Sequence, residues 1–477
     1  MSPSATTEPP EASSYADLFR EGRALYTAAI VLGVMVHALQ VLVMAIIMPT
    51  VVADIGGGAF YTWASMLYSV GGILGTAAVG PIWRRLGRRN GMAFAGLGFL
   101  VGAVACALAP NMGALIVART VQGFSGGLVV GGSMDLVSAK FKGPQRARIL
   151  SIYQGTWLVA QLLGPGIGGS FAAMGWWRGS FWSMVPFLVP FCLLVWLRIP
   201  KGMGETTGRA TFPAGRFALL MAGVLSIAGA GPAGADWLRV CFVVLGVALV
   251  WLTFRLDRES TNRLYPSGLL SLRSPVGLAL WMVFVAGLTQ ASITLFLPLL
   301  LQVAYGVTPL LISYLTILIS CGWTFGAFVV SGWTGRREDI MLQTGPLLML
   351  VGVACLVVAT WAMSLATLTV GAGLLGLGIG IHHVNLSARA IGYALPGEEG
   401  LTASSLPSLR GLGTTFGAAT SGMVANMAGL NEVHDPATVS EATSMVFAVG
   451  LLPLVCSSLF MFRFVRFRRA GVPNAPA

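Results

Sequence analysis

Long apolar runs separated by short polar stretches recur along the whole sequence. A helix needs about 20 residues to cross the hydrocarbon core of a bilayer, which is roughly 30 Å thick. Fourteen of the runs are close to this length. The runs cover approximately residues 25–48, 61–82, 92–110, 113–136, 149–172, 180–198, 216–233, 237–254, 276–302, 308–332, 341–361, 365–388, 401–427 and 443–463. The pattern predicts an all-α integral membrane protein with fourteen transmembrane helices.

The spacing of the runs divides the chain into six, two and six helices. We predict an N-terminal six-helix bundle over residues 23–199, a linker with two extra transmembrane helices over 200–274, and a C-terminal six-helix bundle over 275–465. Residues 1–22, rich in proline, serine and glutamate, and residues 466–477 are expected to be tails. Transporters are commonly built from repeated bundles with the substrate site at their interface, near the middle of the bilayer.

Composition and charge support a membrane protein. The 477 residues are 56% hydrophobic and 10% charged, whereas soluble proteins carry about 25% charged residues. A net charge of +12 would suggest nucleic acid as a partner in a soluble protein. Here the positive-inside rule explains it better, because all but four of the 29 lysines and arginines fall on one predicted side. We therefore expect an inner (plasma) membrane protein with both termini cytoplasmic and no nucleic-acid partner.

A basic stretch separates the second and third runs. It reads Gly80-Pro-Ile-Trp-Arg-Arg-Leu-Gly-Arg-Arg89 and resembles the loop signature of the major facilitator superfamily. The matching positions are Gly80, Arg85, Gly87, Arg88 and Arg89. Arg84 stands where the family carries an aspartate, and Asp135 is an unusual acid near the predicted cytoplasmic end of run 113–136. We expect Arg84 and Asp135 to pair and to form part of a cytoplasmic gate.

Two further stretches resemble motifs of the same superfamily. Arg119-Thr-Val-Gln122-Gly123 is similar to its membrane-embedded arginine motif, and an arginine at this depth should face a wet cavity or a partner. The next run contains the small and kinking residues Gly164, Pro165, Gly168 and Gly169 and is similar to the antiporter motif of exporters. The resemblance implies helix bending during gating, while plain helix packing is the alternative for these glycines.

The first run resembles the signature of the fourteen-helix drug:proton antiporter branch, but it departs from it. Pro49 and Thr50 are retained, whereas Gln40 stands where the branch carries an acid. No aspartate or glutamate lies near the middle of any predicted span. His37 is the candidate proton carrier that remains, one turn before Gln40 on the same helical face. A hydrogen-bonded packing role is the alternative for His37.

The resemblance also implies which helices line the substrate cavity. In the superfamily these are the first and fourth helices of each bundle. The candidate substrate or proton cavity residues are His37, Gln40, Arg119, Gln122, Thr289, Gln290, His382, His383, Asn385 and, on the following helix, Arg410. This set is neutral to positive, which favours neutral or anionic substrates over cations. Hydrogen-bonded packing is again the alternative for His382 and His383.

The sequence therefore predicts an alternating-access secondary transporter, which exports small amphipathic organic compounds and is coupled to protons if His37 carries them. One alternative is a facilitator or importer of an anionic metabolite, with Arg119 and Arg410 as binding charges. Another is a transport-dead sensor or scaffold. We expect a monomer that is not an enzyme and has neither a cofactor nor a metal.

Overall fold

The protein folds entirely into helices across the part of the chain that its computed structural model describes, residues 14–20, 22–60, 62–201, 211–231, 235–430 and 435–469. Both predicted tails, 1–22 and 466–477, fall largely outside these residues, so their character stays a prediction.

The first half begins with a short 3-10 helix, η1 (Tyr15–Leu18), and holds six α-helices. These are α1 (Arg23–Ile55), α2 (Trp63–Ala107), α3 (Met112–Lys140), α4 (Pro144–Ala173), α5 (Arg178–Trp182) and α6 (Val185–Arg198), with the 3-10 turn η2 (Gly58–Phe60) after α1. Local sequence explains where they start. Asn111 caps α3, because its side chain accepts the Ala114 N–H at 2.9 Å. Pro144 opens α4, where a missing N–H costs nothing.

The second half holds eight α-helices. They are α7 (Ala214–Gly229), α8 (Asp236–Arg258), α9 (Pro275–Leu299), α10 (Pro309–Val330), α11 (Gly335–Ala362), α12 (Leu365–Gly392), α13 (Glu399–Met427) and α14 (Pro436–Arg469). A π-helical turn, η3 (Leu300–Ala304), continues α9. Ser364 caps α12 by accepting the Thr367 N–H at 3.2 Å.

The basic stretch differs from the expected loop. Two helical segments, labelled together as α2, meet within it at Gly87, the one residue of α2 outside the helical region, with φ 76° and ψ 158°. Glycine adopts positive φ without a steric penalty. The chain folds back at this residue, since a Cβ placed on Gly91 would lie 2.4 Å from the ring of Trp83. One glycine therefore separates the two apolar runs that the sequence predicted as separate helices.

Nine helical segments among the described residues are long and apolar enough to cross a membrane, counting α5 and α6 together as Arg178–Arg198. Helix α7 and residues Tyr314–Val330 of α10 form shorter apolar helices. The prediction of an all-helical membrane protein is confirmed. The count of fourteen spans stays a prediction.

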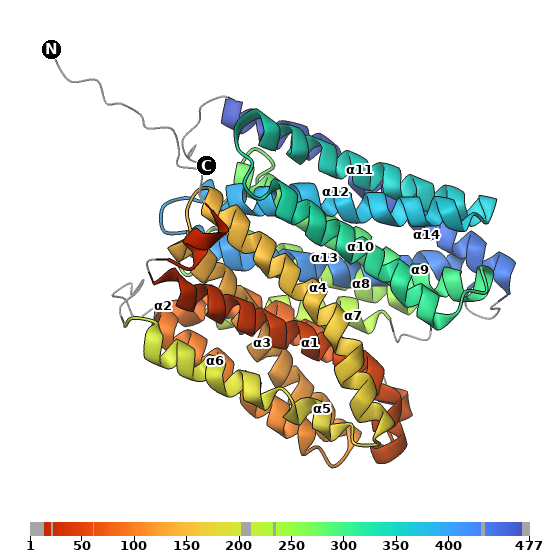
Figure 1. Ribbon diagram of the computed structural model, residues 1–477, viewed down its shortest axis with the longest axis horizontal. Coiled ribbons are helices and arrows are strands. Elements are labelled where there is room, and N and C mark those ends of the chain that lie inside the picture. Colours follow the sequence, from red (N-terminus) through yellow and green to blue (C-terminus); the bar gives the residue numbers. More distant parts are fainter. Residues whose placement is uncertain are drawn as a thin grey trace.

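The helices gather into two bundles (Figure 1). Helices α1 to α6 lie on one side of the molecule and α9 to α14 on the other, with α13 facing the first bundle and α7 and α8 packed beside the junction of the two bundles. Helix α1 packs on α3 and α4, while α9 packs on α13 and α14. The two bundles meet where α13 contacts α2 and α3 and where α4 contacts α10. Helices α7 and α8 pack on each other and reach α2 and α13.

Glycines let helix backbones approach each other inside each bundle. A Cβ on Gly75 of α2 would lie 2.0 Å from the Phe124 carbonyl oxygen of α3, and one on Gly413 of α13 would lie 2.0 Å from the Phe284 oxygen of α9. Such contacts exclude any larger residue at these positions. They fix the rotation of α3 and α13, the helices that carry Arg119 and Arg410.

Candidate functional site

A cavity of about 690 Å³ lies between the two bundles, lined by residues of α1, α2, α3, α4, α7, α9, α10, α12 and α13. Its aromatic and polar lining includes His37, Tyr68, Tyr153, Gln154, Trp157, Gln161, Gln290, Trp323, His383, Ser387 and Arg410. Aliphatic side chains such as Val41, Ile73 and Val130 complete the wall. Among the described lining residues, Arg410 is the sole permanent charge, and none is an aspartate or glutamate. The cavity therefore joins an apolar wall to one fixed positive group.

The structure brings four of the predicted cavity residues to this space: His37, Gln290, His383 and Arg410. The others, Gln40, Arg119, Gln122, Thr289, His382 and Asn385, lie behind the wall with at most 2% of their surface exposed. The rotation of the helices turns these side chains away from the cavity.

Arg119 is sealed inside the first bundle. Its guanidinium donates to the Gln122 side-chain oxygen at 2.6 Å and to the Gln40 oxygen at 3.4 Å. It also lies over the ring of Tyr68, 3.9 Å from the centroid. Gln40 thus occupies the place of a counter-ion beside Arg119 but supplies only a neutral oxygen. The surroundings stabilise a cation through dipoles and a π face, without an ion pair.

His37 connects this sealed cluster to the cavity. The Tyr68 hydroxyl and His37 Nδ1 are 2.9 Å apart, and their rings stack at a centroid distance of 5.5 Å. The edge of the His37 ring meets Trp157 at 6.0 Å. Arg119, Tyr68 and His37 therefore form a contact chain that ends at the cavity surface. Tyr68 and Trp157 were not predicted as site residues, because aromatic residues inside an apolar run carry no distinguishing sequence signal.

The two histidines of α12 face different surroundings. The His382 Nδ1 is 2.7 Å from the Gly378 carbonyl oxygen one turn earlier, and the ring is buried against α11 at Gly345. His383 instead lines the cavity, with its ring edge on Trp323 at 5.8 Å. Asn385 donates to the Val330 carbonyl oxygen of α10 at 3.3 Å. His382 and Asn385 thus serve helix packing in this structure.

Arg410 occupies the second bundle and opens to the cavity. Its guanidinium donates to the Gln290 side-chain oxygen at 2.5 Å and lies 4.3 Å from the centroid of the Trp323 ring. Helices α9 and α13 touch here, because a Cβ on Gly287 would lie 2.3 Å from the Arg410 carbonyl oxygen. This backbone contact fixes where Arg410 enters the cavity.

The bundles are joined at the end that carries the basic stretch, which we call the basic end. Arg88 pairs with Asp135 through two hydrogen bonds, one of them 2.9 Å long from Nη2 to Oδ1. Asp135 also lies against the first turn of α13, since a Cβ on Gly400 would be 2.1 Å from its Oδ1. The pair therefore connects α2 and α3 of one bundle to α13 of the other.

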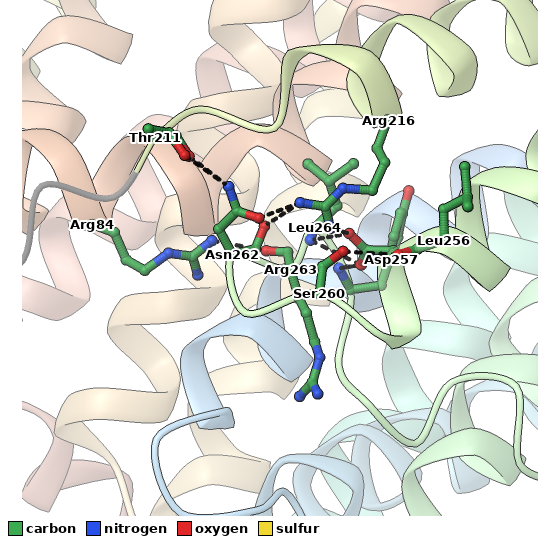
Figure 2. Close-up of polar contacts among 10 residues, drawn as sticks. Arg84, Thr211, Arg216, Leu256, Asp257, Ser260, Asn262, Arg263 and Leu264 are labelled. Carbon is green, nitrogen blue, oxygen red and sulfur yellow. Dashed lines mark hydrogen bonds and ion pairs between the residues drawn. The ribbon is translucent and has the colours of Figure 1, made fainter.

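The predicted pair of Arg84 and Asp135 is wrong. Arg84 donates instead to the Arg263 carbonyl oxygen at 2.9 Å, in the linker between α8 and α9 (Figure 2). The break at Gly87 explains the difference, because Arg88 lies after it and faces α3, whereas Arg84 lies before it and faces the linker. Arg85 is exposed, and Arg89 packs over Trp196 at 4.5 Å.

The linker itself connects the two bundles. Arg263 donates to Glu398, which precedes α13, at 2.7 Å, and the Ser267 N–H donates to the same carboxylate at 3.1 Å. Asp257 orders the linker by pairing with Arg216 of α7 and accepting the Leu264 N–H at 2.9 Å (Figure 2). These contacts could not be predicted from the sequence, because the partners are far apart along the chain and each residue type is common at membrane surfaces.

A third contact at the basic end involves the N-terminal segment. The Tyr15 hydroxyl of η1 bonds to the Ser151 hydroxyl of α4 at 3.0 Å and to the Ser331 hydroxyl after α10 at 2.7 Å. These serines belong to different bundles. The predicted tail thus contributes one ordered residue to the closure of this end.

The glycine-rich part of α4 contacts α1 closely. A Cβ on Gly164 would be 3.1 Å from Leu42, and one on Gly168 would be 3.2 Å from Ile46, while Gly169 has nothing within 4 Å. Pro165 lies within the continuous helix. Gly164 and Gly168 therefore pack α4 on α1, and the bending role expected for the motif stays a prediction.

Comparison with known proteins shows a family and a similar relative. Residues 30–418 match the sequence model of the Major Facilitator Superfamily. The chain is 27% identical over 443 residues to the "Probable multidrug-efflux transporter Rv1634" of Mycobacterium tuberculosis, which covers 88% of this chain and 91% of that protein.

Among solved structures, the human organic anion transporter MFSD10 is similar with a TM-score of 0.66 and 16% identity, over 94% of this chain and 100% of that one. The proton:xylose symporter XylE is similar with a TM-score of 0.64 and 15% identity, over 93% and 95% of the two chains. At these identities the similarity concerns the fold.

Proposed function

Because the chain belongs to the Major Facilitator Superfamily, we propose that it is an alternating-access exporter of small amphipathic organic compounds. The superfamily consists of secondary transporters and not of enzymes, and the chain is a multi-pass membrane protein of this kind. It is distantly homologous to multidrug-efflux transporters. The direction of transport and the nature of the compound are the parts that we propose.

The central cavity is the observation that carries this proposal. It lies between the two bundles and holds about 690 Å³, large enough for a small organic molecule. Trp157 and Trp323 offer aromatic faces, while Gln154 and Gln161 offer hydrogen-bonding groups. A mixed wall of this kind suits compounds with an apolar body and a few polar groups.

We further propose the fourteen-helix arrangement of the drug:proton antiporter branch. Its support is the break at Gly87, which divides α2 into two helices, together with the pair α7 and α8 outside the two bundles. The bundles would span residues 23–199 and 275–465, and the extra pair with its linkers 200–274. The functional unit would be a monomer.

The proposed orientation places the basic end in the cytoplasm, with both termini on that side of an inner or plasma membrane. Lysine and arginine favour the cytoplasmic side of a spanning protein. The Arg88–Asp135 pair, the Arg263–Glu398 pair and the Tyr15 contacts would then close the cytoplasmic gate. On the opposite side, the ion pair Asp54–Arg178 stays within the first bundle. Loading a substrate from the cytoplasm requires Asp135 to separate from Gly400 of α13, and Tyr15 to release Ser151 or Ser331.

Proton coupling is a narrower part of the proposal, and His37 is its candidate carrier. His37 lines the cavity and contacts Tyr68, which lies against Arg119. Unlike a carboxylate, an imidazole gains a positive charge on protonation. The test is proton movement driven by substrate in proteoliposomes, measured with a pH-sensitive dye for the wild type and His37→Ala. Movement that survives the substitution would exclude His37 as the carrier.

An import or facilitator function for an anionic metabolite is the second candidate, and Arg410 favours it because it gives the cavity a positive charge. Arg119, the other binding charge in that prediction, lies behind the cavity wall. Export and import have the same cavity requirements. Flux measured in both directions separates them.

The experiment that tests the function is flux through the purified full-length protein in proteoliposomes. The probes are N-phenyl-1-naphthylamine, 2-naphthamide and 2-naphthoate. We expect flux of at least one probe above that of empty liposomes, and its loss in Thr294→Trp, which fills the cavity. Val247→Trp, at an exposed position of α8, is the matched control and should retain flux. Equal release from empty and protein-containing liposomes for all three probes would overturn the proposal.

A further inference from the structure

The charge balance of the cavity is one-sided. Arg410 lines it, and the described lining residues include no lysine, aspartate or glutamate. The guanidinium is always protonated and has five N–H donors in a planar fork. Arg410 uses one nitrogen for the Gln290 oxygen and one face for Trp323. Both partners are neutral, so the positive charge has no compensating carboxylate among the described residues.

Neighbouring groups add donors and no negative charge. The indole nitrogen of Trp323, whose ring lies under the Arg410 guanidinium, has no hydrogen-bond partner, and neither has the hydroxyl of Ser387 on the cavity wall. His383 meets Trp323 edge-on and also lines the cavity. Together with the Arg410 guanidinium, these residues give the cavity wall hydrogen-bond donors and one positive charge, which suit an anion.

We propose that the cavity binds organic monoanions, with the carboxylate of the ligand on the Arg410 guanidinium and its apolar body against Trp157, Trp323 and the aliphatic wall. One guanidinium matches one negative charge. An apolar wall that includes Val41, Ile73 and Val130 disfavours a small hydrated anion such as phosphate. This inference rests on the proposed transport function and names the substrate class of the same cavity.

The binding test uses purified full-length protein and equilibrium dialysis with 2-naphthoate and its neutral isostere, 2-naphthamide. The wild type should bind the carboxylate at least tenfold more tightly than the amide, because charge-assisted hydrogen bonds are roughly twice as strong as neutral ones. Arg410→Gln should remove that preference while leaving amide binding within about twofold. Arg410→Lys should keep part of the preference, since it retains the charge and loses the fork.

Arg273→Gln is the matched control, because it removes one positive charge at an exposed position of the α8–α9 linker. It should leave the preference for the carboxylate unchanged. Thermal unfolding of each variant in the same detergent separates a lost binding group from a misfolded protein. Equal affinity for the two probes in the wild type, or a preference that survives Arg410→Gln, would overturn the inference.

Flux of the same two probes distinguishes failure of the inference from failure of the proposed function. If the wild type transports 2-naphthamide as well as or better than 2-naphthoate, the transport function is supported and the monoanion inference is wrong. If neither this pair nor N-phenyl-1-naphthylamine binds or is transported, both fall. Faster flux of the carboxylate that is lost in Arg410→Gln supports both.

Discussion

Arg119 and Arg410 lie in different bundles, and their immediate partners are nearly the same. Arg119 lies 3.9 Å above Tyr68 and bonds to the oxygens of two glutamines, while Arg410 lies 4.3 Å above Trp323 and bonds to Gln290. Their access differs. Arg119 is 1% exposed and lies behind the cavity wall, whereas Arg410 lines the cavity.

The difference shows that access to the cavity, more than residue type, decides whether a buried arginine can bind a ligand or only stabilise the fold. A guanidinium at the centre of a membrane helix costs about 2.5 to 3.5 kcal/mol on insertion scales. At Arg119 the cost is offset inside the protein by two amide oxygens and a ring face, so the residue is part of the fold. At Arg410 the protein supplies one amide oxygen and a ring face, and the cavity leaves room for a ligand to provide a further hydrogen-bond acceptor.

The largest expected effect is on the stability of the protein, which should depend more on Arg119 than on Arg410. Arg119→Ala leaves the Gln122 and Gln40 oxygens without their donor and the Tyr68 ring without its cation. We expect a loss on the order of 2 to 3 kcal/mol of stability, from the cost of unsatisfied buried groups and the lost cation–π contact. Thermal unfolding in detergent measures this, with Arg410→Ala as the comparison. A melting temperature of Arg119→Ala equal to that of the wild type would contradict a role in the fold.

The second prediction gives the sealed arginine a charged partner. Gln40→Asp places a carboxylate beside Arg119, where the branch signature carries an acid. In a His37→Ala background, we expect this substitution to restore dependence on an imposed pH gradient. One proton per transport cycle corresponds to 1.36 kcal/mol, or up to about tenfold accumulation, per pH unit. The measurement is probe accumulation with and without the gradient. Gln40→Asn in the same background should show none, and identical behaviour of the two variants would contradict the prediction.

The third prediction uses labelling to compare access to the two sites. In a variant without the six cysteines, Thr414→Cys reports on the cavity wall near Arg410, and Gln122→Cys reports on the sealed cluster. Asp135→Asn weakens the pair with Arg88 that packs against Gly400 of the second bundle, so labelling of Thr414→Cys from the basic end should increase about fivefold, the change expected for about 1 kcal/mol.

The control for this measurement is Asp54→Asn, which breaks an ion pair within the first bundle and should leave labelling unchanged. Gln122→Cys should stay unlabelled in both variants. Labelling of Gln122→Cys as fast as that of Thr414→Cys would remove the distinction between a sealed and an open site.

The smallest effect is expected at Tyr15. Tyr15→Phe removes the hydroxyl that bonds to Ser151 and Ser331, and a typical hydrogen bond contributes about 0.5 to 1.5 kcal/mol. Labelling of Thr414→Cys should increase by about twofold, less than for Asp135→Asn. Arg20→Gln, an exposed change in the same segment, is the control. A rate for Tyr15→Phe equal to that of the control would show that η1 does not contribute to closure.

The sequence predicted the all-helical membrane fold, because apolar length and charge placement have direct physical causes in a bilayer. It did not predict helix rotation. His382 and His383 are adjacent, so they point about 100° apart on a helix, and only packing decides that His383 reaches the cavity. Arg119 and Gln122 are three residues apart and share a face, but the sequence predicted both as cavity residues and did not predict the buried bond between them. The error at Arg84 has a local cause, since the single non-helical residue Gly87 redirects Arg88 towards Asp135.

The contrast between the two arginines is tested most directly by a structure with a bound anion. The full-length protein is prepared with 6-bromo-2-naphthoate, whose bromine marks the ring position in anomalous diffraction. We predict a carboxylate within hydrogen-bonding distance of the Arg410 guanidinium, with the ring near Trp157 or Trp323 and nothing bound at Arg119. A bromine signal placing the ligand at Arg119, or in the cavity with its carboxylate away from Arg410, would contradict the account.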